Sequence, residues 1–328
     1  MSTDIKASYT AADSIPLKVM LDKDLRASIE KDRRILPIHL QFIPTNRCNL
    51  SCSFCSCSER DRGLEMDLGL ARKIIEKFKA VGTKSVTVTG GGEPLMHPKF
   101  AEIIDCFADN GIAIGLVTNG LLLHKVQPHI IDKLTWCRIS NDDSRTMGVG
   151  YQERLSAVVR SCSGVDWAFS HVVSSAPDYA EIRRIIEFAN EHQFTHVRLV
   201  ADLFHPSDIS MDRLRAELLR VGTKDEKVIY QGRKNAERGG PCYIGFLKPL
   251  VGADGRIYAC CGVQYALAIP SRDLPQELCL GDALDIEAIT ASSGSDPLNG
   301  AQCVRCYYGS YNSLLGSMLK DLKHPEFL

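Results

Sequence analysis

The sequence lacks a long apolar run, and it lacks an excess of charge of either sign. No segment approaches the roughly 18 consecutive apolar residues that a membrane-spanning helix needs, which argues against an integral membrane protein. The 328 residues carry a formal net charge of −1. Such a balance gives no general electrostatic reason to expect nucleic acid or an anionic membrane surface as a partner.

A secretory signal is also missing. The first residues, Met1–Lys6, do not have the charged-then-apolar layout of a signal peptide. The chain nevertheless contains 13 cysteines. Without a secretory signal, this number indicates cluster ligands and free thiols rather than a disulfide scaffold. We therefore expect a reducing, cytoplasmic location.

Three of the cysteines lie close together, directly after the apolar run 39–43. Cys48, Cys52 and Cys55 have the spacing Cys-x3-Cys-x2-Cys. One short loop with this spacing can wrap three thiolates around a [4Fe–4S] cluster, whose fourth iron then keeps an open position. An open metal position permits chemistry, as it does in catalytic zinc sites. The alternatives are a zinc knuckle or three unconnected thiols, which the spacing and the soft ligand set disfavour.

The cysteine loop and a later glycine-rich stretch together resemble the radical S-adenosylmethionine (radical SAM) superfamily. The stretch follows the loop by one β/α unit and reads Gly-Gly-Gly-Glu-Pro. The resemblance implies that S-adenosylmethionine (SAM) chelates the open iron through its amino and carboxylate groups, that the stretch holds the amino group, and that Phe54 lies beside the adenine. The implied cofactor-binding residues of the stretch are Gly90, Gly91, Gly92, Glu93 and Pro94.

From residue 38 onward, short apolar runs alternate with helical patterns, which predicts β/α units and a parallel sheet. The six expected strands are 38–43, 85–89, 112–118, 136–139, 167–173 and 196–200. The expected helices between them are 67–81, 98–110, 122–134, 152–162 and 179–192. Periodicity leaves a doubly wound sheet and a curved partial barrel open. The family resemblance implies the partial (β/α)6 TIM-like barrel.

Polar segments follow the expected strands at their C-terminal ends, where the sites of such barrels lie. They include the cysteine loop and the glycine-rich stretch. Ser140 and Asn141 follow the fourth strand, where the family resemblance implies a serine on the ribose of SAM; a simple turn is the alternative. Asn119 lies in a Thr-Asn-Gly motif that the family shares. Asp202 and His205 are candidates for carrying a proton, with plain loop residues as the alternative.

A second group of cysteines occupies the C-terminal third. Two short apolar runs between 248 and 258 flank Ala-Asp-Gly, which predicts a β-hairpin. The hairpin would bring Cys242 and Cys260 together, and the Cys-x2-Cys pair Cys303 and Cys306 completes a four-thiolate set. This pattern resembles the twitch domain, a shortened SPASM domain of radical SAM proteins, and implies one auxiliary [4Fe–4S] cluster. A four-cysteine zinc ribbon is the alternative.

Three spare thiols are alternative ligands. Cys261 or Cys279 would replace Cys260 if the hairpin register differs, and Cys57 lies two residues past the first triad. The chain then divides into four expected regions. They are an N-terminal extension (1–35, with a helix at 21–32), a radical SAM partial-barrel core (36–209), a helical linker (210–240) and a twitch-like auxiliary iron–sulfur domain (241–328).

The resemblance also implies a reaction: reductive cleavage of SAM to a 5′-deoxyadenosyl radical, which abstracts a substrate hydrogen atom. With an auxiliary cluster as electron acceptor, we expect oxidation or oxidative coupling of a small polar metabolite, with a flavodoxin- or ferredoxin-type electron donor. A peptide-modifying enzyme is the first alternative, although 35 residues of extension are too few for a leader-binding domain of typical size. An enzyme acting on a nucleotide or nucleic acid, and a non-catalytic iron–sulfur electron carrier, are the others.

Overall fold

The computed structural model describes residues 11–143, 145–202, 204, 209–232, 239–265, 272–304 and 306–321. Its central feature is a sheet whose larger part consists of seven parallel strands in chain order. These strands are β1 (His39–Phe42), β2 (Ser85–Val88), β3 (Ala113–Thr118), β4 (Leu134–Asp142), β5 (Asp166–Val173), β6 (His196–Ala201) and β7 (Val228–Gln231). The six expected strands are therefore confirmed. The seventh was not expected.

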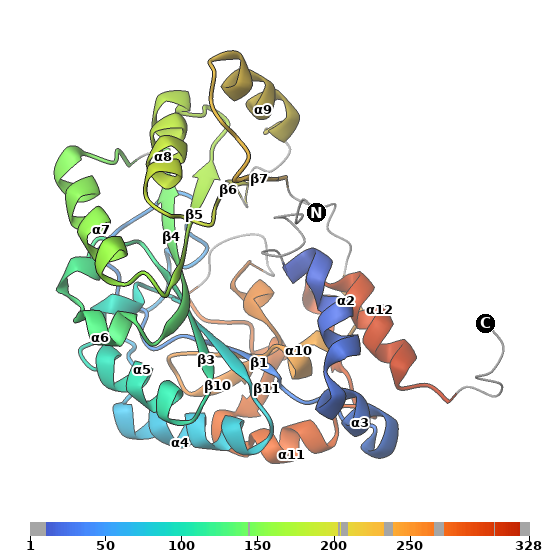
Figure 1. The fold of residues 1–328 in the computed structure, drawn as a ribbon. Coiled ribbons are helices and arrows are strands. Elements are labelled where there is room, and N and C mark those ends of the chain that lie inside the picture. The colour runs from blue at the N-terminus through green and yellow to red at the C-terminus, as the bar shows by residue number, and fades with distance from the viewer. Residues whose placement is uncertain are drawn as a thin grey trace.

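Helices connect the parallel strands and cover the outer face of the curved sheet (Figure 1). They are α4 (Leu68–Ala80), α5 (Phe100–Asp109), α6 (Pro128–Ile131), α7 (Val149–Ser161), α8 (Tyr179–Glu191) and α9 (Met211–Arg220). Side-chain caps begin several of them: the carboxylate of Asp67 accepts from the backbone N–H groups of Gly69 and Leu70 at the start of α4, as N-cap residues do.

Alternation along the strands separates an apolar outer face from a polar inner face. On β4, the side chains of Cys137 and Ile139 are buried in the core cluster beneath the helices. The intervening Arg138 and Ser140 lie on the inner face. The core of the protein therefore sits between sheet and helices, and the concave side of the sheet is left for polar groups.

Two expectations about the barrel were wrong. A helix was expected over 122–134, but the structure has a 3₁₀ turn at Leu123–Lys125 and the short α6, because Pro128 has no N–H to continue a helix and instead occupies its first turn. Region 210–240 was expected to be a helical linker, but it also contributes β7, which pairs in parallel with β6.

The C-terminal region extends the same sheet beyond β1. Strand β9 (Leu250–Val251) pairs in parallel with β1, β10 (Arg256–Tyr258) pairs antiparallel with β9, and β11 (Cys279–Asp282) pairs antiparallel with β10. The predicted hairpin over 248–258 is confirmed. Its turn ends at Gly255, whose φ of +77° favours glycine.

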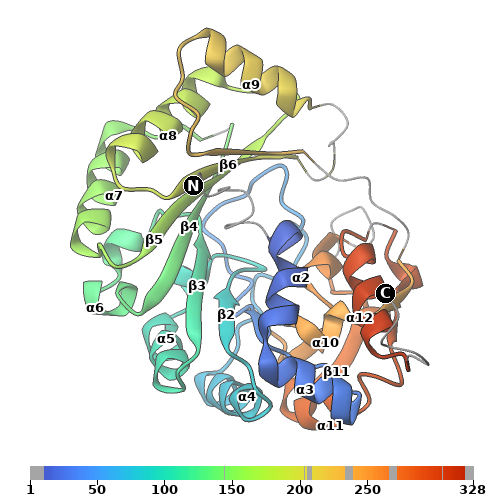
Figure 2. The same cartoon turned by 45° about the vertical axis from the view of Figure 1, so that its right-hand side comes forward.

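A second apolar cluster lies where the N-terminal helices pack against the C-terminal region, which lie side by side in Figure 2 in blue and in orange to red. It combines the N-terminal helices with the C-terminal ones: Val19, Leu25 and Ile29 are buried together with Tyr311 and Leu315. The helices are α2 (Ala11–Leu21), α3 (Lys23–Asp32), α10 (Ile244–Leu247), α11 (Ile286–Ala291) and α12 (Gly309–Met318). None of the helices in the described ranges combines the length and apolar character needed to cross a membrane.

Candidate functional site

The cysteine loop follows β1 and is closed at its neck by backbone pairing. The N–H of Asn46 donates to the carbonyl of Leu64 (2.9 Å), and the N–H of Met66 donates to the carbonyl of Pro44 (2.9 Å). Cys48, Cys52 and Cys55 are half-buried within the loop. The neck holds the ends of the loop together, so the three thiols stay on one side of the sheet edge.

The three thiols lie near one another and near charged side chains. Burial raises the pKa of Cys52 to about 11, and the neighbouring Asp142, Cys55 and Cys48 add to this rise. The pKa of Cys55 is lowered to about 6, chiefly by a hydrogen bond with Cys57 that outweighs burial. Thiolates are the form that binds iron, so the loop already favours one ligand in its reactive state.

Cys57 contacts both Cys55 and the C-terminal region. Its thiol donates to the side-chain carbonyl of Gln264 at 2.8 Å, and its backbone N–H donates to the sulfur of Cys55 at 3.4 Å. Cys57 thus supports Cys55 and joins the loop to the C-terminal region. Phe54, expected beside the adenine of SAM, is half-buried in the turn between Cys52 and Cys55.

The glycine-rich stretch packs directly on the backbone before Cys48. The N–H of Gly92 donates to the carbonyl of Thr45 (3.1 Å), and the N–H of Glu93 donates to the carbonyl of Arg47 (2.7 Å). A Cβ on Gly92 would lie 2.1 Å from that Arg47 carbonyl oxygen, and one on Gly91 would lie 2.1 Å from the Asn46 side chain. Only glycine permits this approach.

Glu93 ties the glycine-rich stretch to the end of β3. Its side chain is 2% exposed. One carboxylate oxygen accepts from the hydroxyl of Thr118 at 2.7 Å, and the other accepts from the backbone N–H of Asn119 at 2.7 Å. Burial raises the pKa of Glu93, although these hydrogen bonds oppose the rise. The side-chain amide of Asn119 then donates to Asn49 at 2.7 Å, so three strand ends converge as expected.

Strand β4 runs further than expected, so Ser140 and Asn141 belong to the strand and not to a turn. They pair with Ser170 and His171 of β5, which extends the ladder. Asn141 is 6% exposed, and its side-chain N–H₂ has no partner among the described residues. An unpaired buried donor at a strand end is a feature that a ligand can satisfy.

An ion pair between Arg145 and Asp142, which no sequence motif predicted, joins the ends of β3 and β4. The guanidinium of Arg145 donates to Asp142 at 3.0 Å and to the backbone carbonyl of Asn119 at 3.3 Å, and it also contacts the carbonyl of Ser140. The pair lies close enough to Cys52 to influence the pKa of that thiol. No spacing motif distinguishes Arg145 from a surface arginine, and its role depends on tertiary contacts.

Of the two candidate proton carriers, one lies among the described residues. The carboxylate of Asp202 accepts from the backbone N–H of Phe204 at 2.9 Å, directly after β6. His205 lies outside the described residues. The role of both stays a prediction.

The four C-terminal cysteines line one pocket. Cys242 belongs to β8 (Pro241–Cys242), which pairs antiparallel with β12 (Leu298–Asn299). Cys260 follows β10, and Cys303 and Cys306 come from the loop after β12. All four sulfur-bearing residues line the pocket together with Tyr307 and Tyr308. Burial raises the pKa of Cys242 to about 12, and the charges of Cys303 and Cys306 add to the rise.

The spare thiols occupy other positions. The sulfur of Cys261 lies 3.6 Å from the hydroxyl of Tyr308, and Cys279 is in β11, where its thiol donates to the carbonyl of Gly281 at 3.8 Å. Neither residue lines the four-cysteine pocket.

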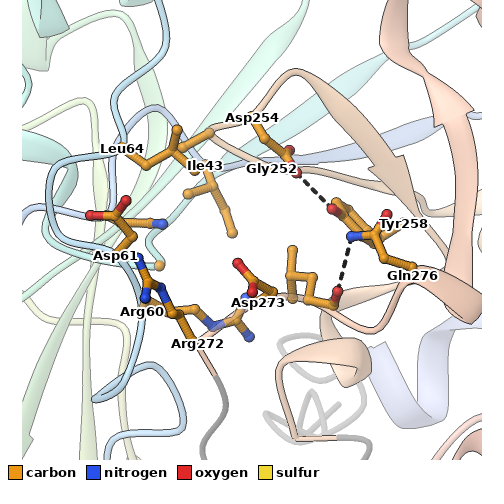
Figure 3. A pocket seen from close by; sticks show the side chains of 14 residues that line it. Ile43, Arg60, Asp61, Leu64, Gly252, Asp254, Tyr258, Arg272, Asp273 and Gln276 are labelled. Carbon is orange, nitrogen blue, oxygen red and sulfur yellow. Dashed lines mark hydrogen bonds between the residues drawn. The ribbon is translucent and has the colours of Figure 1, made fainter.

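A separate cavity of about 60 Å³ lies between the cysteine loop and the C-terminal hairpin (Figure 3). Arg60 and Arg272 line it opposite Ile43, and Tyr258 donates to Asp254 (2.6 Å) at its other side. Arg60 is 7% exposed, and two of its guanidinium nitrogens have no partner among the described residues. Together with Arg62 it lowers the pKa of Cys55, so it supplies positive charge behind the loop.

Comparison with known proteins identifies the barrel. Residues 42–138 match the family described as the Radical SAM superfamily. This part of the chain carries a radical SAM domain. The matched residues begin in β1, contain the cysteine loop and the glycine-rich stretch, and end in β4.

Relatives of known activity match parts of this chain. The S-adenosylmethionine-dependent nucleotide dehydratase of Selenomonas ruminantium is 33% identical over 79 residues, which make up 24% of this chain and 28% of the relative. The AdoMet-dependent heme synthase of Methanosarcina barkeri is 30% identical over 164 residues, 45% of each chain. The chain thus spans less than half the length of these relatives.

Solved structures share the fold over most of the chain. SuiB of Streptococcus suis bound to S-adenosylmethionine gives a TM-score of 0.60 at 16% identity, covering 94% of this chain and 80% of SuiB. At this identity the likeness shows the fold alone. It confirms the radical SAM partial barrel that the sequence predicted.

The superfamily implies a [4Fe–4S] cluster and SAM, and the described residues fit both. Three neighbouring thiols beside Arg60 and Arg62 suit an anionic cluster, and the unpaired buried amide of Asn141 at the strand end suits a polar cofactor. Among the described residues, no three Cys, His, Asp or Glu side chains are arranged around a single metal ion. A cubane spreads its thiolates over several irons and therefore needs a wider set.

Proposed function

We propose that this protein is a radical SAM enzyme that oxidises, or oxidatively couples, a small polar metabolite. When bound, the cluster and SAM supply a 5′-deoxyadenosyl radical for hydrogen abstraction, and an auxiliary cluster supplies an electron acceptor. The observation that carries the proposal is the direct packing of the glycine-rich stretch on the cysteine loop, with hydrogen bonds from Gly92 and Glu93 to Thr45 and Arg47.

The residues of the barrel mouth have distinct roles in this proposal. Cys48, Cys52 and Cys55 hold the cluster, and the buried charge of Arg60 favours the thiolate form of Cys55. Glu93 keeps the glycine-rich stretch fixed to the end of β3, so the carbonyls that would accept from the SAM amino group do not move. Pro94 follows it as the first residue of a 3₁₀ turn, Pro94–Met96.

The end of β4 would contact the rest of SAM. Ser140 and the unpaired amide of Asn141 offer donors at the strand end, and Asn119 is held in place by Asn49. Buried polar groups keep such donors preorganised without solvent reorganisation. Asp202 and His205 remain candidates for moving a proton.

Cys242, Cys260, Cys303 and Cys306 would hold the auxiliary cluster as a twitch-type region, within the proposed C-terminal domain 241–328. The pocket they line includes Ala259, Ile244 and two tyrosines. An apolar, fully thiolate-ligated site has no open iron, which suits electron transfer rather than substrate binding. A flavodoxin- or ferredoxin-type donor would reduce the first cluster. Because free thiols and clusters need a reducing compartment, we place the protein in the cytoplasm.

Anaerobic reconstitution tests the proposal. We expect roughly eight irons per chain, on the three-plus-four thiolate assignment, and formation of 5′-deoxyadenosine from SAM with dithionite. Candidate metabolites should raise the rate of 5′-deoxyadenosine formation and yield a product two electrons more oxidised. Protein with about eight irons that makes no 5′-deoxyadenosine would instead be an iron–sulfur electron carrier.

A peptide is the second candidate substrate. The structure of SuiB bound to its precursor peptide SuiA covers 92% of this chain with a TM-score of 0.59. A barrel of this shape can therefore receive a peptide. The 5′-deoxyadenosine assay distinguishes the two substrate classes. In a peptide-modifying enzyme, a precursor peptide would raise the rate of 5′-deoxyadenosine formation and small metabolites would not.

A further inference from the structure

The inner face of the barrel carries two cations that no ion pair with Asp or Glu neutralises in the described part of the chain. The charged groups that act on Arg138 are the thiols of Cys261 and Cys137. Those that act most strongly on Lys248 are the thiols of Cys261 and Cys260 and the cations of Arg138 and Lys18. Neither set contains a carboxylate, and the groups that oppose the positive charge in both sets are cysteine thiols.

The strand register places Arg138 beneath the proposed SAM site. Ser140 is level with Ser170 of β5, which is level with Arg198 of β6. Arg138 precedes Ser140 by two residues and faces the same side, so its backbone lies about 7 Å further into the barrel. Its guanidinium lies over the ring of Trp136, 5.4 Å from the ring centroid.

Lys248 reaches the same interior from the C-terminal region. It lies two residues before Leu250, which pairs with Gln41 of β1, and the N–H of Gln41 donates to the carbonyl of Pro249 (2.9 Å). This pairing sets Lys248 beside the start of β1. The charge of Lys248 acts on His39 there and is itself influenced by Arg138, so charged groups of β1, β4 and the C-terminal region lie within electrostatic reach of one another.

Two cations within electrostatic reach of each other inside a protein are costly unless an anion joins them. Burial lowers the pKa of Arg138 and that of Lys248, which reflects this cost. The surrounding inner-face groups are polar and cationic too: His196 lies level with Arg138 through Ala168, and Arg198 donates to Gln231. The interior is thus prepared for negative charge.

We propose that Arg138 and Lys248 bind an anionic group of the substrate, a carboxylate or a phosphate, on the inner face of the barrel. The proposal rests on the proposed function and adds to it the class of substrate. The planar guanidinium of Arg138 can bind two oxygens of either group, and the ammonium of Lys248 adds a point charge. An anion held there leaves the rest of the substrate at the level of Ser140, next to the proposed SAM site.

Two other anions in the site are poorer partners. The SAM carboxylate would chelate the open iron at the cysteine loop, and Ser140 and Asn141, which would contact other parts of SAM, begin one inward-facing position above Arg138. The auxiliary cluster would lie in the four-cysteine pocket, which neither Arg138 nor Lys248 lines, although the thiol of Cys260 in that pocket acts on Lys248. The substrate is the remaining anion of the reaction.

Tryptophan fluorescence offers a binding test that needs no turnover. The chain has two tryptophans: Trp136 under Arg138 and Trp167, which is 1% exposed in the core. Anaerobically reconstituted holoenzyme is titrated with inorganic phosphate and, separately, with succinate, at constant ionic strength set by KCl. We expect a saturable change with at least one anion, and the responding anion identifies phosphate or carboxylate as the preferred group.

Arg138→Gln and Lys248→Gln should each raise the Kd for that anion at least tenfold, whereas Arg138→Lys should have a smaller effect. Arg183→Gln is the matched control, because Arg183 pairs with Glu187 on the exposed face of α8, and it should bind like the unmodified protein. No response beyond that to KCl, or equal responses in Arg138→Gln and the control, would overturn the proposal.

Iron content and SAM affinity distinguish a substrate anion from the auxiliary cluster and from SAM. Both should be unchanged in Arg138→Gln and Lys248→Gln. Loss of about half the iron would assign the cations to the auxiliary cluster, and a tenfold loss of SAM affinity would assign them to SAM; either result refutes the proposal. If phosphate or succinate binds through Arg138 but no 5′-deoxyadenosine forms, the anion site stands and the proposed function fails.

Discussion

The two cysteine sites of this protein are built in opposite ways. In the first, one loop supplies all three thiols, and backbone pairing of 44–46 with 64–66 closes it. In the second, Cys242 and the pair Cys303 and Cys306 come together through the pairing of β8 with β12, and Cys260 arrives from the hairpin. The first is a local structure and the second a tertiary one.

Their electrostatics differ as well. A hydrogen bond from Cys57, against burial, brings the pKa of Cys55 to about 6, and Arg62 and Arg60 contribute to this lowering. In the second site, burial raises the pKa of Cys242 to about 12 and that of Cys303 to about 11. A charged, half-exposed site suits an iron that receives a charged cofactor. An apolar site with a full set of four thiols suits an electron acceptor.

The largest effect should come from the first site. Cys52→Ala removes one of three ligands of the first cluster, so 5′-deoxyadenosine formation should fall at least about 1000-fold and iron content should fall by roughly four per chain. Cys106→Ala is the control, because Cys106 packs against the core from α5. Chromatographic assay of 5′-deoxyadenosine with iron analysis measures both; full activity in Cys52→Ala would refute the assignment.

The second site should separate substrate oxidation from SAM cleavage. Cys303→Ala should remove roughly four irons per chain and abolish product formation while slow, uncoupled 5′-deoxyadenosine formation continues, because the first cluster is untouched. Cys279→Ala, outside the four-cysteine pocket, should behave as the unmodified protein. Equal loss of both activities in Cys303→Ala would show that the two sites are not independent.

The glycine-rich stretch should tolerate no side chain. Gly92→Ala places a Cβ 2.1 Å from the Arg47 carbonyl oxygen, which should destabilise the protein by about 3 kcal/mol and weaken SAM binding. Gly148→Ala is the matched control, because a Cβ there has open space around it. Urea unfolding of both variants compares them; equal stability would mean that the cysteine loop can move away.

The smallest effect concerns Glu93 and pH. Burial raises its pKa above 4.5 in the folded protein, so its stabilising contribution is fully present below pH 4.5 and is lost as the pH rises through the raised value. Relative to Glu93→Gln, the unmodified protein should therefore gain free energy of unfolding as the pH falls from about 7 towards 4.5. Urea unfolding across this range measures the difference. A gap that does not change with pH would refute the shift.

Much of the barrel could be predicted from periodicity. Strands β1–β6 and helices α4, α5, α7 and α8 follow from apolar runs and three- to four-residue stripes. Strand β7 could not be predicted, because its four residues alternate weakly and exist as a strand only by pairing with β6. Strands β9–β11 were expected as a separate domain, but their pairing with β1 places them in the same sheet.

The residues of the candidate site likewise fall into those that a sequence motif predicts and those that no motif predicts. The spacing of Cys48, Cys52 and Cys55 and the glycines at 90–92 carry a signal of their own, since short-range chemistry requires them. Arg60, Arg138, Arg145 and Lys248 carry none. An arginine on an outer strand face and one on an inner face look alike in sequence, and only the curvature of the sheet tells them apart.

By itself, the sequence determined the β/α order, the three-thiolate loop and the glycine-rich stretch, because each depends on neighbours within a few residues along the chain. Only the tertiary structure decided which cations lie inside the barrel, which thiols share the second pocket, and that the C-terminal strands continue the main sheet. Those outcomes depend on strand pairing and burial between distant segments, and long-range pairing leaves little trace in local composition.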